Sequence, residues 1–487
     1  MKKIRIIAVV LTMGVFPALA TAQNISPVDF MRNNPRAAYA NPAFFTADYG
    51  FFDMALGGIN VSVQNIGFKY DKFMRFNASG QPVAINLNQG VSSLRNTNYF
   101  NTFLDFDIFN CGRQTKHGYF TYSHRIREME SFRYNKGAME LLANGNAAFL
   151  GVDHPAKLDL GLSLKAYQEF NFGYQMCLTE RLNIGARVKF LMGLADAKSK
   201  SLNMQLVTDP ETYAMSISGA VDVRTTLPYE LLLNQGHLSV LDSRFNIANL
   251  FKNYGAGIDL GAEYRINDEF GVAAAINDLG FIRWNHFSTR FYAGIEDAGG
   301  YYQNGSFVFS GLTSEEINQI ISDPNGLSSA VDTLIRYFSI GSETMKGYTS
   351  GLNTTMMVRG YYDLTPQHRF SAQLTGYASG VGFRPAMTLA YTGSFLDKFD
   401  VVTTYTMMKG SYGNVGVGLS ADLGGFLVYV ASSNVFGFFN PVNTSNLNFQ
   451  FGISFTSGYK TRRNDRVVIK DIVVEIEENT EEQSENN

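Results

Sequence analysis

The sequence predicts an all-β fold, a transmembrane antiparallel β-barrel of about 14 strands with a lumen plug and long extracellular loops. Three observations predict it. Apolar and polar side chains alternate along many segments, the connections between these segments alternate between short and long, and the chain starts with an export signal.

The N-terminus carries the pattern of a secretory signal peptide. Basic residues within the first five positions precede an apolar stretch over 6–19, and a run of small residues follows at 20–22. A charged start, a short apolar core and a small-residue cleavage site are the parts of such a peptide. We therefore expect 1–22 to be removed and the mature chain to begin near Gln23.

Composition excludes several classes of protein. The chain is 45% hydrophobic, yet after position 22 it has no run near the roughly 18 apolar residues that a transmembrane helix needs. It holds 46 Gly, 39 Phe and 26 Tyr, which favours strands and tight turns. With 17% charged residues and a net charge of -3, it lacks the basic footprint of a nucleic-acid-binding protein.

The clearest alternation lies near the C-terminus. Large apolar side chains occupy every second position of 447–455, and small or polar ones lie between them. The same period recurs in 170–176, 184–190, 370–375 and 415–422. Because strand side chains point to opposite faces, one face is apolar and the other polar. The polar faces carry charges, which favours an enclosed lumen over the alternative, a soluble sandwich of two sheets.

The connections predict the topology and the domain boundaries. Short polar connections are expected around 179–182, 266–270, 364–369, 396–398 and 422–425, with long excursions at 196–254 and 285–353. Outer-membrane barrels have short periplasmic turns and long external loops. The expected strands are 55–70, 101–109, 117–127, 166–178, 183–193, 254–265, 270–283, 354–363, 370–377, 386–395, 399–408, 414–421, 426–432 and 446–457. The barrel thus spans 54–458, and a charged periplasmic tail spans 459–487.

The mature N-terminus is expected to enter the lumen. Three prolines, Pro27, Pro35 and Pro42, interrupt 23–53, so this segment cannot be a central strand. A barrel of this width leaves a channel unless something fills it. We therefore predict that 23–53 forms a plug, or hatch.

Two family resemblances support this architecture. Asn41-Pro42-Ala43, followed by Phe44 and Phe45, resembles the Asn-Pro-Ala signature in the hatch of FadL-type long-chain fatty acid transporters. That resemblance implies a barrel with the same strand number and plug residues at these five positions. The alternative is that Asn-Pro merely starts a turn.

The second resemblance is to an uncharacterised outer-membrane barrel family of Gram-negative Bacteroidota, a domain of unknown function. The stretch 433–453 resembles that family's closing hairpin, and 277–282 with Trp284 resembles its mid-barrel strand. The resemblance implies fold and location, the cell outer membrane, but no substrate.

Charged residues on the polar faces of the early strands should meet in the lumen. They are Asp105, Asp107, Arg125, Arg127, Glu169, Arg187 and Lys189. Buried opposite charges tend to pair. One interpretation is an ion-pair lattice that stiffens the wall and grips the plug, and the other is a ligand-selecting patch.

Other segments carry weaker signals. Within 313–335, helical spacing of isoleucine, valine and leucine predicts two helices, either packed on the barrel rim or forming an apolar lid. Cys111 and Cys177 fall on the second and fourth strands, too far apart for the disulfide to be favoured. The histidines lack metal-ligand spacing and no Gly-x-Ser-x-Gly motif occurs, so we expect no metal, no cofactor and no enzyme.

Two functions fit these observations. The first is passive transport of hydrophobic or amphipathic small molecules through a plugged lumen, with outer-membrane lipid around the barrel and a hydrophobic ligand inside it. The second is a non-transporting outer-membrane scaffold for a secretion or surface-protein complex. In that case the tail would bind a periplasmic protein by adding a strand at 467–474.

Overall fold

The computed structural model describes most of the chain in separate stretches. These are residues 25–32, 34–44, 52–115, 118–212, 215–227, 230–234, 237–242, 251–293, 303–305, 341–379, 382–396, 398–408, 411–441 and 444–457. The expected signal peptide, Phe45, the two helices expected within 313–335 and the tail 459–487 lie outside the described residues.

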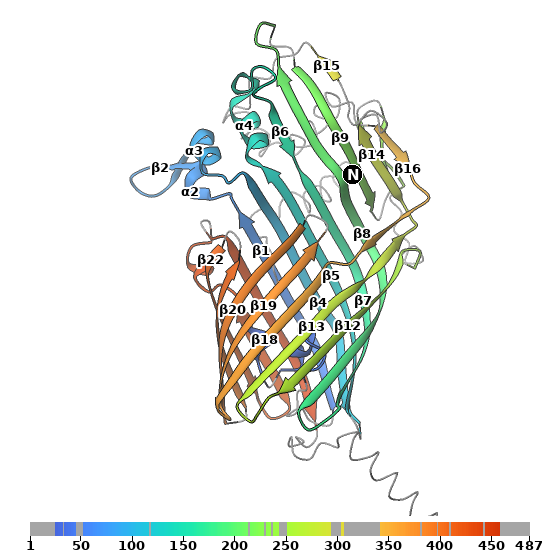
Figure 1. The fold of residues 1–487 in the computed structure, drawn as a ribbon, viewed down its shortest axis with the longest axis vertical. Helices are drawn as coiled ribbons and strands as arrows, with labels where there is room; N and C mark the ends of the chain where they lie inside the picture. Colours follow the sequence, from blue (N-terminus) through green and yellow to red (C-terminus); the bar gives the residue numbers. More distant parts are fainter. Residues whose placement is uncertain are drawn as a thin grey trace, which may run out of the picture.

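Fourteen strands form a closed antiparallel barrel (Figure 1). In order around the wall they are β1 (Phe52–Ile66), β4 (Thr97–Gln114), β5 (Gly118–Asn135), β7 (Gly161–Cys177), β8 (Leu182–Thr208), β12 (Tyr254–Arg265), β13 (Phe270–Trp284), β18 (Thr354–Thr365), β19 (His368–Ser379), β20 (Gly382–Phe395), β21 (Phe399–Met408), β22 (Ser411–Asp422), β23 (Phe426–Ser432) and β24 (Asn446–Ser457). Each pairs with the next, and β24 pairs with β1 from Phe52↔Ser457 to Gln64↔Asn446. The expected fold class is confirmed.

The early strands are longer than the sequence predicts. β8 runs for 27 residues, whereas alternation predicted only 183–193. The excursion expected over 196–254 therefore starts as a continuation of β8 and turns back as β9 (Met215–Thr226). Beyond the barrel the two faces of a strand no longer meet an apolar and a polar medium, so the alternation that predicts strands disappears there.

Short strands extend the sheet past the barrel rim. They are β6 (Ala156–Asp159), β14 (Ser288–Ala293), β15 (Gln303–Gly305), β16 (Gly341–Thr344) and β17 (Tyr348–Gly351). Two separate hairpins join β2 (Met74–Phe76) to β3 (Pro82–Ile85) and β10 (Glu230–Asn234) to β11 (His237–Asp242). The short helices among the described residues are η1 (Pro27–Phe30), η2 (Pro35–Tyr39), α2 (Tyr70–Phe73), α3 (Leu87–Ser92), α4 (Lys136–Asn144), η3 (Asn146–Ala148) and α8 (Phe436–Phe439). None of these helices is long and apolar enough to cross a bilayer.

The five expected short connections all join barrel strands at one end, the lower end in Figure 1. The first residue of β1 and the last residue of β24 pair at this same end. We call it the short-turn end. Cys111 on β4 and Cys177 on β7 are both free thiols, and β5 lies between their strands.

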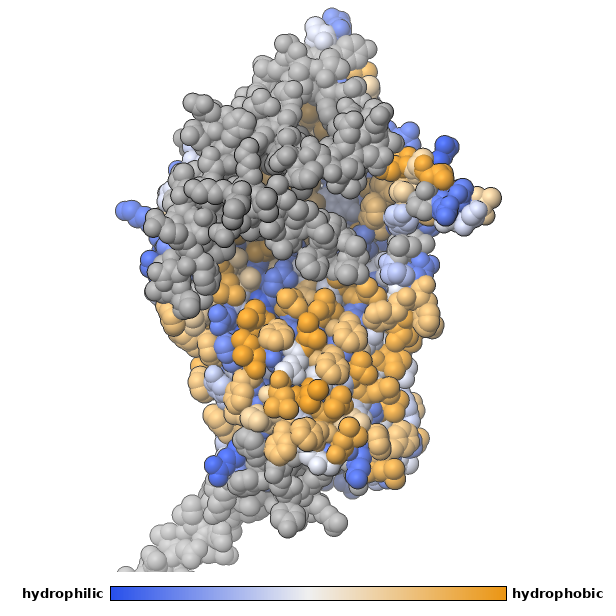
Figure 2. Space-filling model, turned by 180° about the vertical axis from the view of Figure 1, so that it is seen from behind, coloured by the Kyte–Doolittle hydropathy of each residue, from blue (hydrophilic) through white to orange (hydrophobic). Residues whose placement is uncertain are grey.

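The outer surface of the barrel is apolar, and Figure 2 shows these residues gathered in a band. Leu374 and Val188 are each 60% exposed, while their neighbours Gln373 and Lys189 point inward and are buried. This is the reverse of a water-soluble protein, whose polar groups lie outside. An apolar band this large around a barrel with a polar interior is typical of a lipid-embedded protein.

Candidate functional site: the lumen and its N-terminal segment

Residues 25–44, apart from the undescribed Asn33, form what we call the N-terminal segment. It contains two short 3-10 helices, η1 (Pro27–Phe30) and η2 (Pro35–Tyr39). Ser26 Oγ accepts a hydrogen bond from Val28 N (2.9 Å), and Asn34 Oδ1 accepts one from Arg36 N (3.0 Å). Proline is favoured in the first turn because its fixed φ suits a helix and it has no N–H to satisfy. The prolines therefore start helices here.

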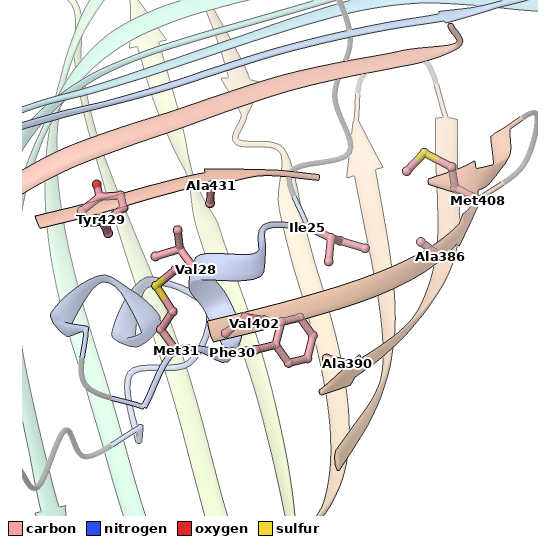
Figure 3. Close-up of a cluster of buried hydrophobic side chains, with 10 residues drawn as sticks. All are labelled: Ile25, Val28, Phe30, Met31, Ala386, Ala390, Val402, Met408, Tyr429 and Ala431. Atoms are coloured by element: carbon pink, nitrogen blue, oxygen red, sulfur yellow. The ribbon is translucent and has the colours of Figure 1, made fainter. Parts of the chain in front are cut away.

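The apolar side chains of the segment pack against one side of the barrel (Figure 3). Four buried residues of the segment contact small and apolar side chains of β20, β21 and β23. The cluster consists of Ile25, Val28, Phe30, Met31, Ala386, Ala390, Val402, Met408, Tyr429 and Ala431. At the short-turn end, Arg32 Nη1 donates to Pro366 O in the turn after β18 (2.6 Å). The segment therefore lies inside the lumen near that end.

The Asn-Pro-Ala turn is held against the opposite side. Asn41 is fully buried, and its Nδ2 donates to the carbonyls of Ala262 and Ala274, 3.2 Å from each. Its Oδ1 accepts a hydrogen bond from Ala43 N (2.8 Å), which closes the turn. The side-chain amide of Gln175 is oriented so that its nitrogen donates to the backbone carbonyls of Pro42 (3.1 Å) and Phe44 (2.9 Å).

Two glycines make room for this turn. Gly185 on β8 and Gly261 on β12 are cross-strand partners. A Cβ atom would lie 2.0 Å from Pro42 O at Gly185, and 1.9 Å from Asn41 Oδ1 at Gly261. Neither position admits a side chain while the turn is seated, so wall and turn have complementary shapes.

All seven charged residues singled out in the sequence are buried and lie close together in the lumen. Arg125 binds Asp105 (3.1 Å) and also pairs with Glu169. Arg127 lies 3.3 Å from Glu169. Arg187 and Lys189 on β8 continue the layer, and Lys189 Nζ is 3.6 Å from Glu169 Oε2.

Sequence reasoning missed two carboxylates of this layer, Asp259 and Asp278. Asp259 lies 3.0 Å from Arg187 Nε and 2.9 Å from Lys189 Nζ. Asp278 lies 2.9 Å from Arg127 Nη1 and also pairs with Lys189. Four cations and four carboxylates therefore form one connected wall network: Arg125, Arg127, Arg187 and Lys189 with Asp105, Glu169, Asp259 and Asp278.

A β-bulge explains why Asp278 was missed. The register of β12 against β13 shifts between Ile258 and Leu260, opposite Asn277 and Asp278. Asp278 has φ 61°, the left-handed region that Asn and Asp tolerate better than most residues. Its N–H donates to Asp259 Oδ1 (2.7 Å). The bulge turns two consecutive side chains inward, which simple alternation cannot predict.

Arg36 connects the segment to this layer. Its Nη2 lies 2.6 Å from Asp107 Oδ2, and a second nitrogen hydrogen-bonds to the hydroxyl of Tyr429. The ring of Tyr39 lies among three guanidinium groups, 4.0 Å from that of Arg125, 5.3 Å from Arg187 and 5.6 Å from Arg36. Such cation–π contacts are stronger where water is excluded.

A cavity of about 110 Å³ lies between the segment and the charged layer. Asp105, Arg127 and Lys189 line it together with Phe103, whose ring centre lies 5.7 Å from the Arg127 guanidinium, and Met357 and Tyr377 line it from β18 and β19. The lining is thus mainly charged and polar, with a few apolar side chains among the polar ones. No group of three or more metal-ligating side chains occurs in the described part of the chain.

Comparison with solved structures finds similar barrels at low sequence identity. The Pseudomonas putida toluene transporter TodX is 9% identical, with a TM-score of 0.38, over 90% of this chain and 97% of that chain. The Ralstonia pickettii toluene transporter TbuX is 11% identical, with a TM-score of 0.41, over 88% and 94%. A Pseudomonas aeruginosa FadL homologue is 10% identical, with a TM-score of 0.31, over 90% and 96%.

No curated protein sequence matches the chain. A family model does match, over residues 42–433, which is most of the barrel and the end of the N-terminal segment. The chain therefore belongs to a family of unknown function, DUF5723.

Proposed function

We propose that this protein lies in the outer membrane and passes hydrophobic or amphipathic small molecules through its lumen, which the N-terminal segment plugs. The apolar band and closed barrel support the membrane location, because a barrel satisfies every backbone hydrogen bond of its wall without water. The signal-peptide pattern supports export.

One observation carries the proposal: the N-terminal segment packs against both sides of the lumen wall near the short-turn end. Asn41 is fully buried between the wall and its own turn. The segment touches the wall through short helices and a turn, without joining the sheet. It can therefore be displaced while the barrel keeps its strand pairing.

The cavity beside the segment supports an amphipathic ligand. Phe103 and Met357 give it apolar surface, while Arg127 and Asp105 give it charged surface. A molecule with an apolar body and a polar head group would find a partner for each in this lining. The resemblance of residues 41–45 to the FadL-type hatch favours the same ligand class.

Deletion of residues 25–44 tests the plug. We expect single-channel conductance in planar bilayers to rise several-fold, because the lumen of a barrel of this width is an open channel once it is emptied. A matched control deletes residues 74–85, the β2–β3 hairpin, which forms its own small sheet outside the barrel wall. Equal conductance of the two deletion variants would contradict the proposal.

The sheet beyond the barrel rim favours a second candidate function, the scaffold. β8 and β9 pair over 196–226 and extend the wall well past the barrel, together with β14 and β16 (Figure 1). Such an extension beyond the apolar band is a surface to which a protein partner could bind. A variant shortened in β8 and β9 would lose a co-purifying partner if the protein is a scaffold, and would keep its transport if it is not.

A further inference from the structure

Arg36 of the N-terminal segment is seated in a socket that belongs to the wall. The socket is one row of cross-strand partners: Asp107 pairs with Gly58, Gly58 with Gly452, and Gly452 with Tyr429. The carboxylate and the phenol ring stand at the two ends of this row, and the two glycines between them form a floor without side chains.

The floor is shaped for a guanidinium group. A Cβ atom at Gly58 would lie 2.3 Å from Arg36 Nη1, and one at Gly452 would lie 2.4 Å from the Tyr429 hydroxyl. Arg36 lies 5.5 Å from the centre of the Tyr429 ring and 2.6 Å from the Asp107 carboxylate. A carboxylate beside aromatic rings is the arrangement with which proteins bind organic cations.

The socket carries one carboxylate, Asp107, that the cations of the wall network do not pair with. The wall network is neutral by itself, because its four cations match its four carboxylates. Asp107 stands outside that network and is only 1% exposed, and the ion pair it makes is with Arg36. A buried carboxylate without a partner is strongly unfavourable. When the segment leaves, Asp107 must therefore take up a proton or bind another cation in place of Arg36.

From this geometry we infer that the socket is a binding site for a small organic cation, a guanidinium or ammonium group carried by the lumen ligand. Arg36 occupies the site in the plugged state, and the ligand competes with it. The lumen cavity is lined by Arg36 itself and by Asn60 and Gln450, the next inward pair along β1 and β24, so the cavity adjoins the socket and a ligand in it would enter the socket as Arg36 leaves. This inference rests on the proposed plug, and it specifies that the head group of the proposed ligand is positively charged.

Chemical rescue of an Arg36→Ala variant tests the socket. Methylguanidinium at millimolar concentration should recover most of the thermal stability that the detergent-purified full chain loses in Arg36→Ala, because a ligand that binds only the folded state stabilises it. The same concentration of sodium chloride should recover none of it. Arg36→Ala/Asp107→Asn, which lacks the carboxylate, should not respond to methylguanidinium.

A matched control comes from an arginine outside the lumen. Arg133 pairs with Asp159 at 2.8 Å, and both side chains are partly exposed, at 29% and 48%. Methylguanidinium should leave the melting temperature of Arg133→Ala unchanged. Absence of rescue in Arg36→Ala, or equal rescue in all three variants, would overturn the inference.

Conductance separates failure of the socket from failure of the plug. If the plug is correct, Arg36→Ala opens more often than the wild type in planar bilayers, because its segment has lost one anchor. If methylguanidinium restores the stability of Arg36→Ala but the conductance of this variant equals that of the wild type, the socket is supported and the plug is rejected. Raised conductance without thermal rescue would keep the plug and reject the socket.

Discussion

The two halves of the barrel wall hold the N-terminal segment by different means. The N-terminal half-wall, β4 to β13, faces it with the charged network, Asp107 and backbone carbonyls. The C-terminal half-wall, β18 to β24, faces it mostly with threonine, serine, amide and small apolar side chains, and packs against its apolar residues. Both half-walls hold the segment with directional bonds, which fix its register, and the C-terminal half-wall adds apolar packing, whose stabilisation grows with the buried area.

This difference also implies different costs. Ion pairs in a buried network are expensive to break singly, because the remaining partner stays charged. A substitution that removes an apolar contact or a hydrogen bond between neutral hydroxyls costs only the free energy of that contact. We therefore expect the N-terminal half-wall to be far more sensitive to a single substitution.

The largest effect is expected for Glu169→Gln. Glu169 is fully buried and pairs with Arg125, Arg127 and Lys189. Loss of its charge leaves these cations with fewer carboxylates, which costs about 3–5 kcal/mol for a broken buried pair. The measurement is the free energy of unfolding of the barrel in detergent, or the temperature at which its compact gel band disappears.

The comparison variant is Thr388→Val in the C-terminal half-wall. Thr388 Oγ1 shares a 2.9 Å hydrogen bond with Thr406 Oγ1, and both residues are buried. Its loss should cost about 1 kcal/mol, the typical worth of a neutral hydrogen bond. Equal costs for the two variants would show that the halves do not differ in the way proposed.

An intermediate effect is expected for Gly185→Ala. The added methyl group would meet the backbone carbonyl of Pro42 at 2.0 Å, so the Asn-Pro-Ala turn must shift. Overpacking of this kind costs about 1–3 kcal/mol. Because the methyl group meets the turn, the segment should become easier to cleave with protease in the purified protein.

Gly360→Ala is the matched control for that variant. Gly360 faces outward from β18, and a Cβ atom there would have nothing within 4 Å. Its segment should resist protease as the wild type does. If Gly185→Ala is equally resistant, the turn is not seated against Gly185 as described.

The sequence predicts the barrel well because lipid and lumen impose opposite demands on alternate residues. Alternation placed β12, β21, β23 and β24 with bounds that the structure reproduces. It also identified the charged residues of β4, β5, β7 and β8. It fails where strands leave the apolar band, because it predicts a loop for the second half of β8.

The rest of the site depends on contacts that a periodic pattern does not contain. Asp259, between Ile258 and Leu260, had the right alternation and could have been found by extending the same argument to β12. Asp278 could be predicted only by recognising the β-bulge. The sequence signal for that bulge is the turn-forming run Asn-Asp-Leu-Gly inside a strand. Arg36 could not be placed at all, because nothing in the sequence pairs it with Asp107.

Plugging is also predicted to depend on pH. Asp29 lies on the side of the segment that faces the C-terminal half-wall, where Arg359 donates to its backbone carbonyl (2.9 Å). Burial raises the pKa of Asp29 from 3.8 to about 6, although the hydrogen bond from Ser26 and the charge of Arg359 act in the opposite direction.

The seated segment therefore binds a proton more tightly than the released one. By linkage, seating is most favourable below about pH 4 and weakens as the pH rises through 6. Open probability in planar bilayers should accordingly rise between pH 4 and pH 6 and stay level above it. Asp29→Asn, which keeps an acceptor for Ser26 but cannot ionise, should abolish this step, and a step that persists in Asp29→Asn would assign the pH dependence to the charged half-wall instead.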